Sequence, residues 1–463
     1  MNHSWWDRVV ESVADRGRDI LKLKSVTNGT GRVPELCEAL LSSAGAAAGM
    51  ALAREIVRAF DAMSDDERTQ FFETLYRRFG PSRERILAAA DAYRDDGDDL
   101  HTYLALSAAV EPPRQELFRR LNQAPHGTAT LVRMREHLLR VLKERPHLRA
   151  VDEDLKHLLS SWFNPGFLRL ERIDWGTSAN ILEKLIGFEA VHAIRDWDDL
   201  HRRLEDDRRC FAFFHPALAG EPLIFVEVAL VKGMASAAAP LLAHDAPVLD
   251  PDEADTAIFY SINNCQVGLR GISFGNFLIK QVMSELMLEL PGIKRFATLS
   301  PLPRFAQALQ AGDEGPFTTQ RLRALLDDDA EALRTRAQTD DVAEALQTLL
   351  QGDVHAHSDV LSTPLQRLAL AYLTLAKRHG KVYDPVARFH LSNGAQLERI
   401  NPFADASTLR MGQSFGVMVN YRYEPNEVER NHELFVNEGT VPMSRALIRE
   451  ARRLEARWKG KEG

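Results

Sequence analysis

The chain has 463 residues, of which 45% are hydrophobic and 27% are charged, and its formal net charge is −8 at pH 7. This length predicts more than one domain, and the composition is that of a soluble globular protein. The mildly acidic balance argues against a general nucleic-acid binder, although it leaves room for a local basic groove.

The cysteines and the N-terminus bear on the compartment. Cys37, Cys210 and Cys265 are far apart and form no C-x-x-C pair, which favours a reducing environment and argues against a disulfide framework or a zinc site. The first twenty residues contain no apolar signal core, the longest small-apolar run is too short to span a bilayer, and the C-terminus lacks a peroxisomal S-K-L ending. We therefore expect a cytoplasmic protein that binds no membrane and no metal.

Helical periodicity dominates residues 1–162. Ser64, followed three residues later by Glu67, predicts a capping box at the start of one helix. Few segments in this half resemble strands, so we predict an all-α domain that serves as an oligomerisation surface or a lid. The sequence of this half shows no catalytic constellation.

The pattern changes at Asn164, Pro165 and Gly166, which mark a domain boundary. The strand-like segments that follow are "CFAFFHP", "PLIFVEVALV", "TAIFYSINN", "RFATL", "VARFHL" and "FGVMVNYRY". They alternate with helical patterns, so residues 163–463 are predicted to form a mixed α/β domain around a central mixed sheet. The acidic, Ala/Leu-rich stretch from about 307 to 362 is interpreted as a helical insertion.

A glycine-rich loop connects the "TAIFYSINN" strand to the next helix. It contains Gly268, Gly271 and Gly275, together with the cation Arg270. A strand, a glycine loop and a helix N-terminus form a layout that binds phosphate, because the first helical amides lack partners. The loop matches neither the Walker nor the dinucleotide spacing. An ordinary strand-to-helix turn, with Asn263, Asn264 and Gln266 as turn and capping groups, is the alternative.

Two polar residues lie at predicted strand ends. Pro301 follows Ser300 and cannot donate to a ladder, so the "RFATL" strand is expected to end near Ser300. His390 lies at the end of the predicted "VARFHL" strand, and open sheets build their sites at strand ends. A turn serine and an isolated histidine are the alternatives. Ser300 is not in a G-x-S-x-G elbow and no acidic residue has an obvious triad position, so a hydrolase nucleophile is poorly supported.

These segments resemble the malonyl-CoA decarboxylase family. The similarity includes "GLRGISFGNFLIK", "FATLSPLPRF", "ARFHLSNGAQLERIN" and "GVMVNYRY", and it covers about Phe167 to Tyr423 well and the helical half more loosely. The resemblance implies a helical domain, a C-terminal domain similar to GNAT acyltransferases, and a homotetramer. It also implies conversion of malonyl-CoA to acetyl-CoA and CO2 without a metal or organic cofactor.

The resemblance also suggests which residues form the site. The expected catalytic residues are Ser300, His390 and Tyr423. The residues expected to bind CoA or substrate are Gln266, Gly268, Arg270, Gly271, Ser273, Gly275 and Asn393. The CoA pyrophosphate is placed on the loop from Gly268 to Gly275, before a helix that is expected to start near Phe274. Animal members carry an acidic residue where this chain has Ser273, so a role for that carboxylate does not transfer.

The chemistry suits these residue types. Ser300 can donate a hydrogen bond to the malonyl carboxylate, and a histidine with a pKa near neutrality, His390, can protonate the carbanion left by CO2. Two other functions stay open from the sequence. One is a CoA-dependent N-acyltransferase that uses His390 as a base, and the other is a non-catalytic acyl-CoA sensor whose helical half is the output surface.

Overall fold

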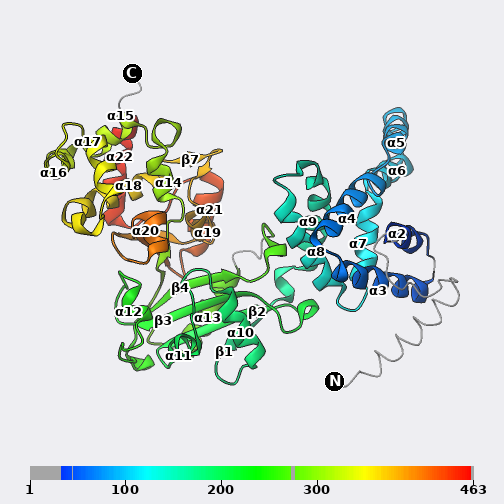
Figure 1. The fold of residues 1–463 in the computed structure, drawn as a ribbon, viewed down its shortest axis with the longest axis horizontal. Coiled ribbons are helices and arrows are strands. Elements are labelled where there is room, and N and C mark those ends of the chain that lie inside the picture. The colour runs from blue at the N-terminus through cyan, green and yellow to red at the C-terminus, as the bar shows by residue number, and fades with distance from the viewer. Residues whose placement is uncertain (1–32, 44, 273–276, 460–463) are drawn as a thin grey trace. The chain divides into compact units, whose positions relative to one another are not determined.

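The computed structural model describes residues 33–43, 45–272 and 277–459. The chain divides into two compact units (Figure 1). Unit 1 consists of the described residues up to Arg169, Phe214–Leu223 and 264–272, and unit 2 of Leu170–Phe213, Ile224–Asn263 and 277–459. Unit 1 therefore contains two segments that follow the helical half by some distance along the chain, and one of them is the described part of the glycine loop.

Unit 1 is built mainly from helices around one apolar core. Its α-helices are α2 (Val33–Ser42), α3 (Ala46–Ala62), α4 (Asp65–Arg78), α5 (Arg83–Asp95), α6 (Leu100–Val110), α7 (Pro113–Asn122), α8 (Gly127–Val141) and α9 (Arg149–Trp162). The predicted capping box is confirmed at α4, where Ser64 Oγ accepts the Glu67 amide at 3.3 Å and the Glu67 carboxylate accepts the Ser64 amide at 2.8 Å. The predicted all-α character of this half is confirmed.

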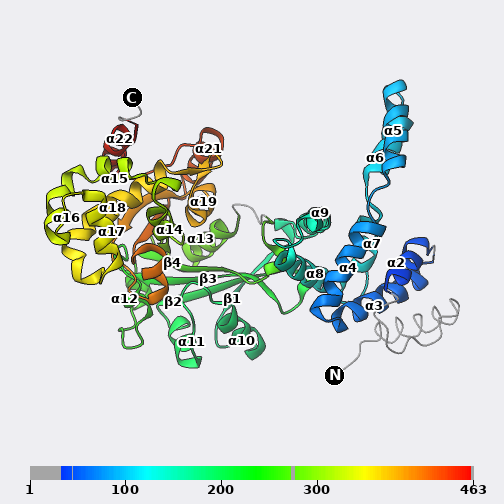
Figure 2. The same ribbon diagram turned by 45° about the horizontal axis from the view of Figure 1, so that its top comes forward.

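The α5–α6 hairpin projects from the rest of unit 1 (Figure 2). Helix α5 has no buried residue, and Ala109 is the buried residue of α6. Several large apolar side chains on the hairpin are exposed, namely Leu87, Leu100, Tyr103, Leu104 and Val110. The two helices pack against each other, but their outer apolar surface has no cover within the described chain.

Unit 2 is built on a mixed sheet. Its strands in the described chain are β1 (Arg169–Ile173), β2 (Arg208–Phe214), β3 (Pro222–Val231), β4 (Thr256–Asn264), β5 (Arg295–Thr298), β6 (Ser300–Pro301), β9 (Gln396–Asn401) and β10 (Met418–Tyr423). They follow the order β1-β2-β3-β4-β5-β10-β6, with β9 also paired to β10. Strands β4 and β5 are parallel, whereas β10 is antiparallel to β5, β6 and β9. The predicted mixed sheet is confirmed.

The predicted "RFATL" strand ends before Ser300, but pairing with β10 resumes at Ser300 after one residue. Strand β5 closes at Thr298, and the amide of Leu299 then donates to the Phe259 carbonyl at 3.1 Å. Pairing to β10 resumes for the two residues of β6, where Ser300 lies opposite Val419. Pro301 ends the strand there, in agreement with its missing amide proton.

Helices cover the sheet and extend beyond it. The α-helices of unit 2 are α10 (Ala179–Phe188), α11 (Trp197–Arg203), α12 (Ala239–Leu242), α13 (Phe277–Glu289), α14 (Phe305–Gln310), α15 (Thr319–Leu325), α16 (Ala330–Ala337), α17 (Val342–Gln351), α18 (Ser358–Thr374), α19 (Pro385–Ser392), α20 (Thr408–Ser414), α21 (Val428–Glu438) and α22 (Arg445–Lys459). A small hairpin of β7 (Lys377–Arg378) and β8 (Lys381–Val382) precedes α19. The stretch expected to be a helical insertion forms helices, and α15 packs against the C-terminal helix α22.

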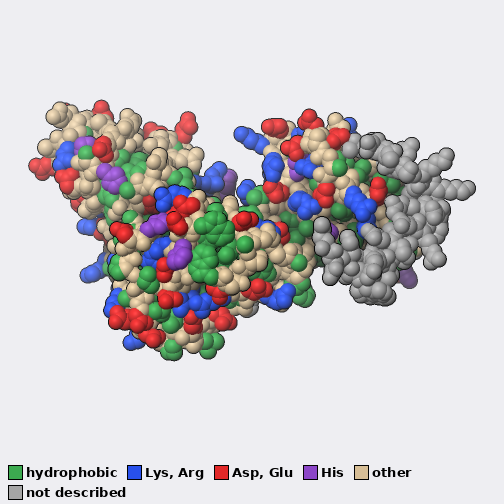
Figure 3. Space-filling view, turned by 60° about the horizontal axis from the view of Figure 1, so that its bottom comes forward, with side chains coloured by type: hydrophobic (Ala, Val, Ile, Leu, Met, Phe, Trp, Pro, Cys, Tyr) green, Lys and Arg blue, Asp and Glu red, His purple; other side chains and the backbone are tan. Residues whose placement is uncertain are grey.

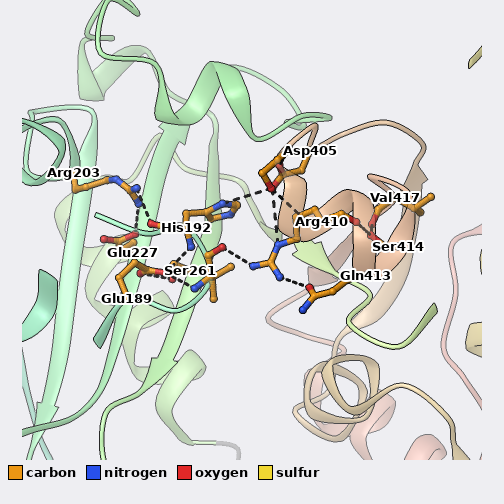
Figure 4. Close-up of polar contacts among 12 residues, drawn as sticks. Glu189, His192, Arg203, Glu227, Ser261, Asp405, Arg410, Gln413, Ser414 and Val417 are labelled. Atoms are coloured by element: carbon orange, nitrogen blue, oxygen red, sulfur yellow. Dashed lines mark hydrogen bonds and ion pairs between the residues drawn. The ribbon is translucent and has the colours of Figure 1, made fainter. Parts of the chain in front are cut away.

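A buried polar network ties the segment after α10 to the sheet (Figure 4). The Glu189 carboxylate accepts Ser261 Oγ at 2.7 Å and Asn263 Nδ2 at 2.8 Å, both from β4. Nearby, Arg203 of α11 donates to Glu227 of β3 at 2.8 Å. Because buried polar groups are costly without partners, this network holds α11 and the loop before it on the sheet. Asn263 is thus a structural residue at the end of β4.

The surface is mixed in charge. On the face shown in Figure 3, Lys and Arg side chains are interspersed with Asp and Glu over the described residues of both units. Among the described residues, no helix combines the length and apolar character that crossing a bilayer would need.

Candidate active site

All three predicted catalytic residues come together in unit 2. Ser300 lies on β6 and Tyr423 at the end of β10, and both are buried. Ser300 Oγ is 3.0 Å from His390 Nε2, and His390 Nδ1 is 2.9 Å from the Tyr423 hydroxyl oxygen. Sequence positions 300, 390 and 423 therefore form one hydrogen-bonded cluster around the imidazole.

His390 lies on a helix, so the predicted strand "VARFHL" is wrong. Helix α19 begins at Pro385, and Asp384 caps it by accepting the amides of Val386 at 2.9 Å and Ala387 at 3.0 Å. An Asp-Pro pair is an ordinary helix start, because the carboxylate accepts the free amides and proline has none to leave unpaired. His390 therefore approaches the sheet from the last turn of a helix rather than from a strand end.

Burial controls the protonation state of the cluster. It lowers the pKa of His390 to about 3 and raises the pKa of Tyr423 well above its ordinary value. The expected near-neutral pKa of His390 is wrong for the ligand-free protein, because the imidazole has no compensating negative charge. The cluster is uncharged at neutral pH, with one N–H on the imidazole.

Two members of the cluster were missed in the sequence. Thr298 Oγ1 lies 2.8 Å from Ser300 Oγ, and the ring of Tyr421 stacks on the His390 ring with 4.7 Å between centroids. Alternate residues of a strand share a face. The motifs "TLS" and "YRY" could therefore have predicted these two members, because each motif places a second side chain two residues from a predicted catalytic one, on the same face of the strand.

Gly268 of the glycine loop is needed for packing. A Cβ at this position would lie 2.0 Å from the Val132 carbonyl oxygen of α8. The buried guanidinium of Arg135, also on α8, donates to the carbonyls of Gly268 at 2.7 Å and Arg270 at 2.9 Å. Asp152 of α9 accepts from the same guanidinium at 2.8 Å. The described part of the loop is therefore anchored to the helices of unit 1.

The other predicted binding residues differ in their surroundings. Gly271 has φ +78°, which favours glycine, and a Cβ there would meet no more than the Lys156 side chain at 4.0 Å.

The predicted polar binding residues lie in different surroundings. The Arg270 side chain is exposed, and Gln266 Nε2 donates to the Pro222 carbonyl at 3.1 Å. Asn393 ends α19 and donates to the Phe389 carbonyl at 2.7 Å. Ser273, Gly275 and the expected helix start at Phe274 lie outside the described residues.

Metal ligands do not gather in the described part of the chain. Within residues 33–43, 45–272 and 277–459, no group of three His, Cys, Asp or Glu side chains could hold a metal ion.

The mixed sheet and its buried hydroxyl–imidazole cluster define the C-terminal unit as that of an α/β enzyme. Two family models match the chain. "Malonyl-CoA decarboxylase N-terminal domain" matches residues 79–163, and "Malonyl-CoA decarboxylase C-terminal domain" matches residues 166–462. Together they account for most of the chain.

Individual relatives agree. The chain is 35% identical over 422 residues to the mitochondrial malonyl-CoA decarboxylase of Anser anser anser, covering 85% of this chain and 82% of that protein. The crystal structure of malonyl-CoA decarboxylase from Rhodopseudomonas palustris has 45% identity and a TM-score of 0.80, covering 91% of this chain and all of that one. The structure from Agrobacterium vitis has 46% identity and a TM-score of 0.79, covering 90% and 99%. This chain belongs to the malonyl-CoA decarboxylase family, whose members are carboxy-lyases.

Proposed function

We propose that this protein converts malonyl-CoA to acetyl-CoA and CO2 at the Ser300–His390–Tyr423 cluster. The observation that carries the proposal is the 3.0 Å contact between Ser300 Oγ and His390 Nε2 in a buried site of a malonyl-CoA decarboxylase family member. Two residues ninety positions apart are brought into one cluster by different elements, one from the sheet and one from a helix.

Ser300 is proposed to orient the carboxylate that leaves. Loss of CO2 requires the breaking C–C bond to stand out of the thioester plane, so that its electrons can pass into the carbonyl. One hydrogen bond from Ser300 Oγ to a carboxylate oxygen fixes that rotation.

His390 is proposed to supply the proton that completes acetyl-CoA. Its pKa of about 3 applies to the protein without substrate. A malonyl carboxylate beside the imidazole favours the charged form, so substrate binding raises this pKa and loads the ring with a second proton. Once CO2 has left, the imidazolium gives its Nε2 proton, which until then is donated to Ser300 Oγ, to the carbanion as a new C–H bond forms, and the ring returns to the neutral form with its proton on Nδ1. The Tyr423 hydroxyl, 2.9 Å from Nδ1, can accept from the imidazolium or donate to the neutral ring.

The decisive assay adds malonyl-CoA alone to the purified protein. We expect acetyl-CoA and CO2 in equal amounts with no acceptor present and with no loss of rate after dialysis against EDTA. An N-acyltransferase would need an acceptor amine, and an acyl-CoA sensor would give no product. Activity that disappears with EDTA and returns with a metal would contradict the proposal of a cofactor-free reaction.

The proposed CoA site is the glycine loop of unit 1. Arg270 is exposed there, and the aliphatic part of the Lys156 side chain lies close to Gly271, so two basic residues lie at this loop. The Arg135 contacts turn the carbonyls of Gly268 and Arg270 toward α8. That arrangement suits an anion on the outer side of the loop, because it draws two carbonyl dipoles away from the bound charge.

We predict that Gly271→Asp weakens CoA binding about fivefold or more, since two like charges 4 Å apart repel by about 1 kcal/mol even in water. Gly271→Asn is the matched control, because asparagine has nearly the same shape as aspartate and a similar tolerance of φ +78° but carries no charge. Isothermal titration with CoA measures both. Equal affinities for the two variants would place the phosphates elsewhere.

The α5–α6 hairpin is proposed to bind a second copy of the chain within a homotetramer. Leu100 is 65% exposed and Tyr103 54% exposed, and Leu87, Leu104 and Val110 of the same hairpin are exposed as well. A hairpin that buries almost nothing against its own unit gains stability from a partner that covers it.

We predict that Leu104→Lys shifts the protein to a smaller assembly at micromolar concentration. Leu409→Lys on α20 is the control, because Leu409 is 53% exposed and Leu104 is 51% exposed. Light scattering coupled to size exclusion reports the mass. A monomeric wild type, or an unchanged mass for Leu104→Lys, would exclude the hairpin contact.

The cytoplasmic location and the lack of nucleic-acid binding also stay predictions. Cell fractionation tests the first, and a binding assay with nucleic acid tests the second.

A further inference from the structure

Thr298 is a fully buried residue of β5 whose side chain faces the catalytic cluster. Its Oγ1 lies 2.8 Å from Ser300 Oγ and accepts the Tyr421 backbone amide at 3.2 Å. Its carbonyl oxygen separately accepts Asn420 Nδ2 at 2.8 Å. The carbonyl contact and the pairing of β5 to β4 and β10 hold the strand. The contact of the hydroxyl with Ser300 is additional to that framework.

The hydrogen-bonding capacity of the two hydroxyls allows an arrangement in which the Ser300 proton points at Thr298. A hydroxyl has one proton to donate and two lone pairs that accept. Thr298 Oγ1 uses one lone pair for the Tyr421 amide and can accept the Ser300 proton with the other. His390 Nε2–H then donates to Ser300 Oγ, and the Tyr423 hydroxyl donates to Nδ1. In this arrangement the Ser300 proton is held by Thr298.

A bound malonyl carboxylate changes this arrangement, because an ionised acceptor attracts a hydroxyl proton more strongly than a neutral oxygen does. The Ser300 proton turns to the carboxylate, and Thr298 turns its own proton onto Ser300 Oγ. Ser300 then accepts from both Thr298 and His390 and donates to the substrate, so both of its lone pairs and its proton are used. No covalent bond changes in this step, since two hydroxyl rotations are sufficient.

We propose that Thr298 is a positioning residue that directs the Ser300 proton, holding it in the free protein and donating to Ser300 when the substrate carboxylate takes it. This role rests on the proposed decarboxylase function. It also explains why Ser300 acts as a donor: with Thr298 and His390 both donating to Oγ, its proton is directed at the substrate rather than at the imidazole.

The test begins with Thr298→Val, which keeps the shape and removes the hydroxyl. Loss of one neutral hydrogen bond should lower kcat/KM for malonyl-CoA about 2- to 12-fold. The Kd for acetyl-CoA, which lacks the carboxylate, should stay unchanged. Thr298→Ser keeps the hydroxyl and should retain most of the activity. A Thr298→Ser variant as slow as Thr298→Val would overturn the role assigned to the hydroxyl.

A double-mutant cycle separates this role from a purely structural one. If Thr298 acts through Ser300, then adding Thr298→Val to Ser300→Ala should cause no further loss. Independent, multiplying losses would overturn the inference while leaving the decarboxylase proposal intact. A wild type that forms no acetyl-CoA would instead refute the proposed function. If Thr298→Val does not fold, Thr298→Cys, whose thiol is a weak donor and acceptor, takes its place in the same cycle.

Discussion

His390→Asn should lower kcat by about 10²- to 10⁴-fold, the usual contribution of a positioned acid, which corresponds to about 3–5 kcal/mol of transition-state stabilisation. Asn can still hydrogen-bond to Ser300 but cannot carry the second proton that the substrate induces on the imidazole. Steady-state kinetics with malonyl-CoA, together with CoA titration, should show the loss in turnover rather than in binding. His379→Asn is the control, because His379 is exposed and its φ of +51° suits asparagine.

Ser300→Ala should be less damaging than His390→Asn, which distinguishes the donor role from a nucleophilic one. Removing one hydrogen bond to a charged group costs about 1.5–3 kcal/mol, or about one to two decades in kcat. An acyl-serine mechanism would make Ser300→Ala at least as damaging. It would also leave a malonyl or acetyl adduct on Ser300 in rapidly quenched protein. Intact-mass spectrometry decides the matter, and an adduct there would refute the assigned role.

Gly394→Ala should destabilise the protein by about 2–5 kcal/mol, the sum of left-handed backbone strain and overpacking. Gly394 follows α19 with φ +82°, and a Cβ there would lie 2.1 Å from the Val428 carbonyl oxygen of α21. Asn431 of α21 also donates to the Gly394 carbonyl at 3.3 Å. Since α19 carries His390, the variant should lose turnover together with stability. Urea unfolding and steady-state kinetics measure the two effects.

Gly439→Ala is a matched control for that clash. Gly439 follows α21 with φ +68°, and a Cβ there would meet nothing within 4 Å. It should therefore show the backbone strain alone, about 1–2 kcal/mol, with turnover preserved. If both variants lost the same stability, the close approach of α19 to α21 would not matter.

The sheet could be predicted from the sequence because its strands carry strong local signals. Segments such as Pro222–Val231 and Thr256–Asn264 are largely apolar and rich in β-branched and aromatic residues, and the structure has strands with these bounds. The cluster members Ser300 and His390 could be chosen because their motifs resemble a known family. Their 3.0 Å contact depends on how β6 and α19 pack, which no local pattern encodes.

The errors have physical causes. The segment before His390 mixes valine, phenylalanine and arginine in a strand-like alternation, and the helix-starting Asp384–Pro385 pair outweighs that pattern. The pKa of His390 depends on complete burial, which a sequence does not reveal. Gly268 was interpreted as a glycine of a phosphate-binding loop. The structure shows that it must be glycine because a Cβ would collide with a backbone carbonyl of α8, which lies more than a hundred residues earlier in the chain.

The anchoring of the glycine loop by α8 has a consequence for chimeras between relatives. The family models divide the chain between residues 163 and 166, whereas unit 1 also includes Phe214–Leu223 and 264–272. An exchange of halves at that sequence boundary would place a foreign α8 against the native Gly268, where there is room for a hydrogen atom but not for a methyl group. Helix α8 and the segment 264–272 must be transplanted together to keep that fit. Sequence changes in α8 and in the loop are thus expected to be inherited as pairs, even though more than a hundred residues separate them.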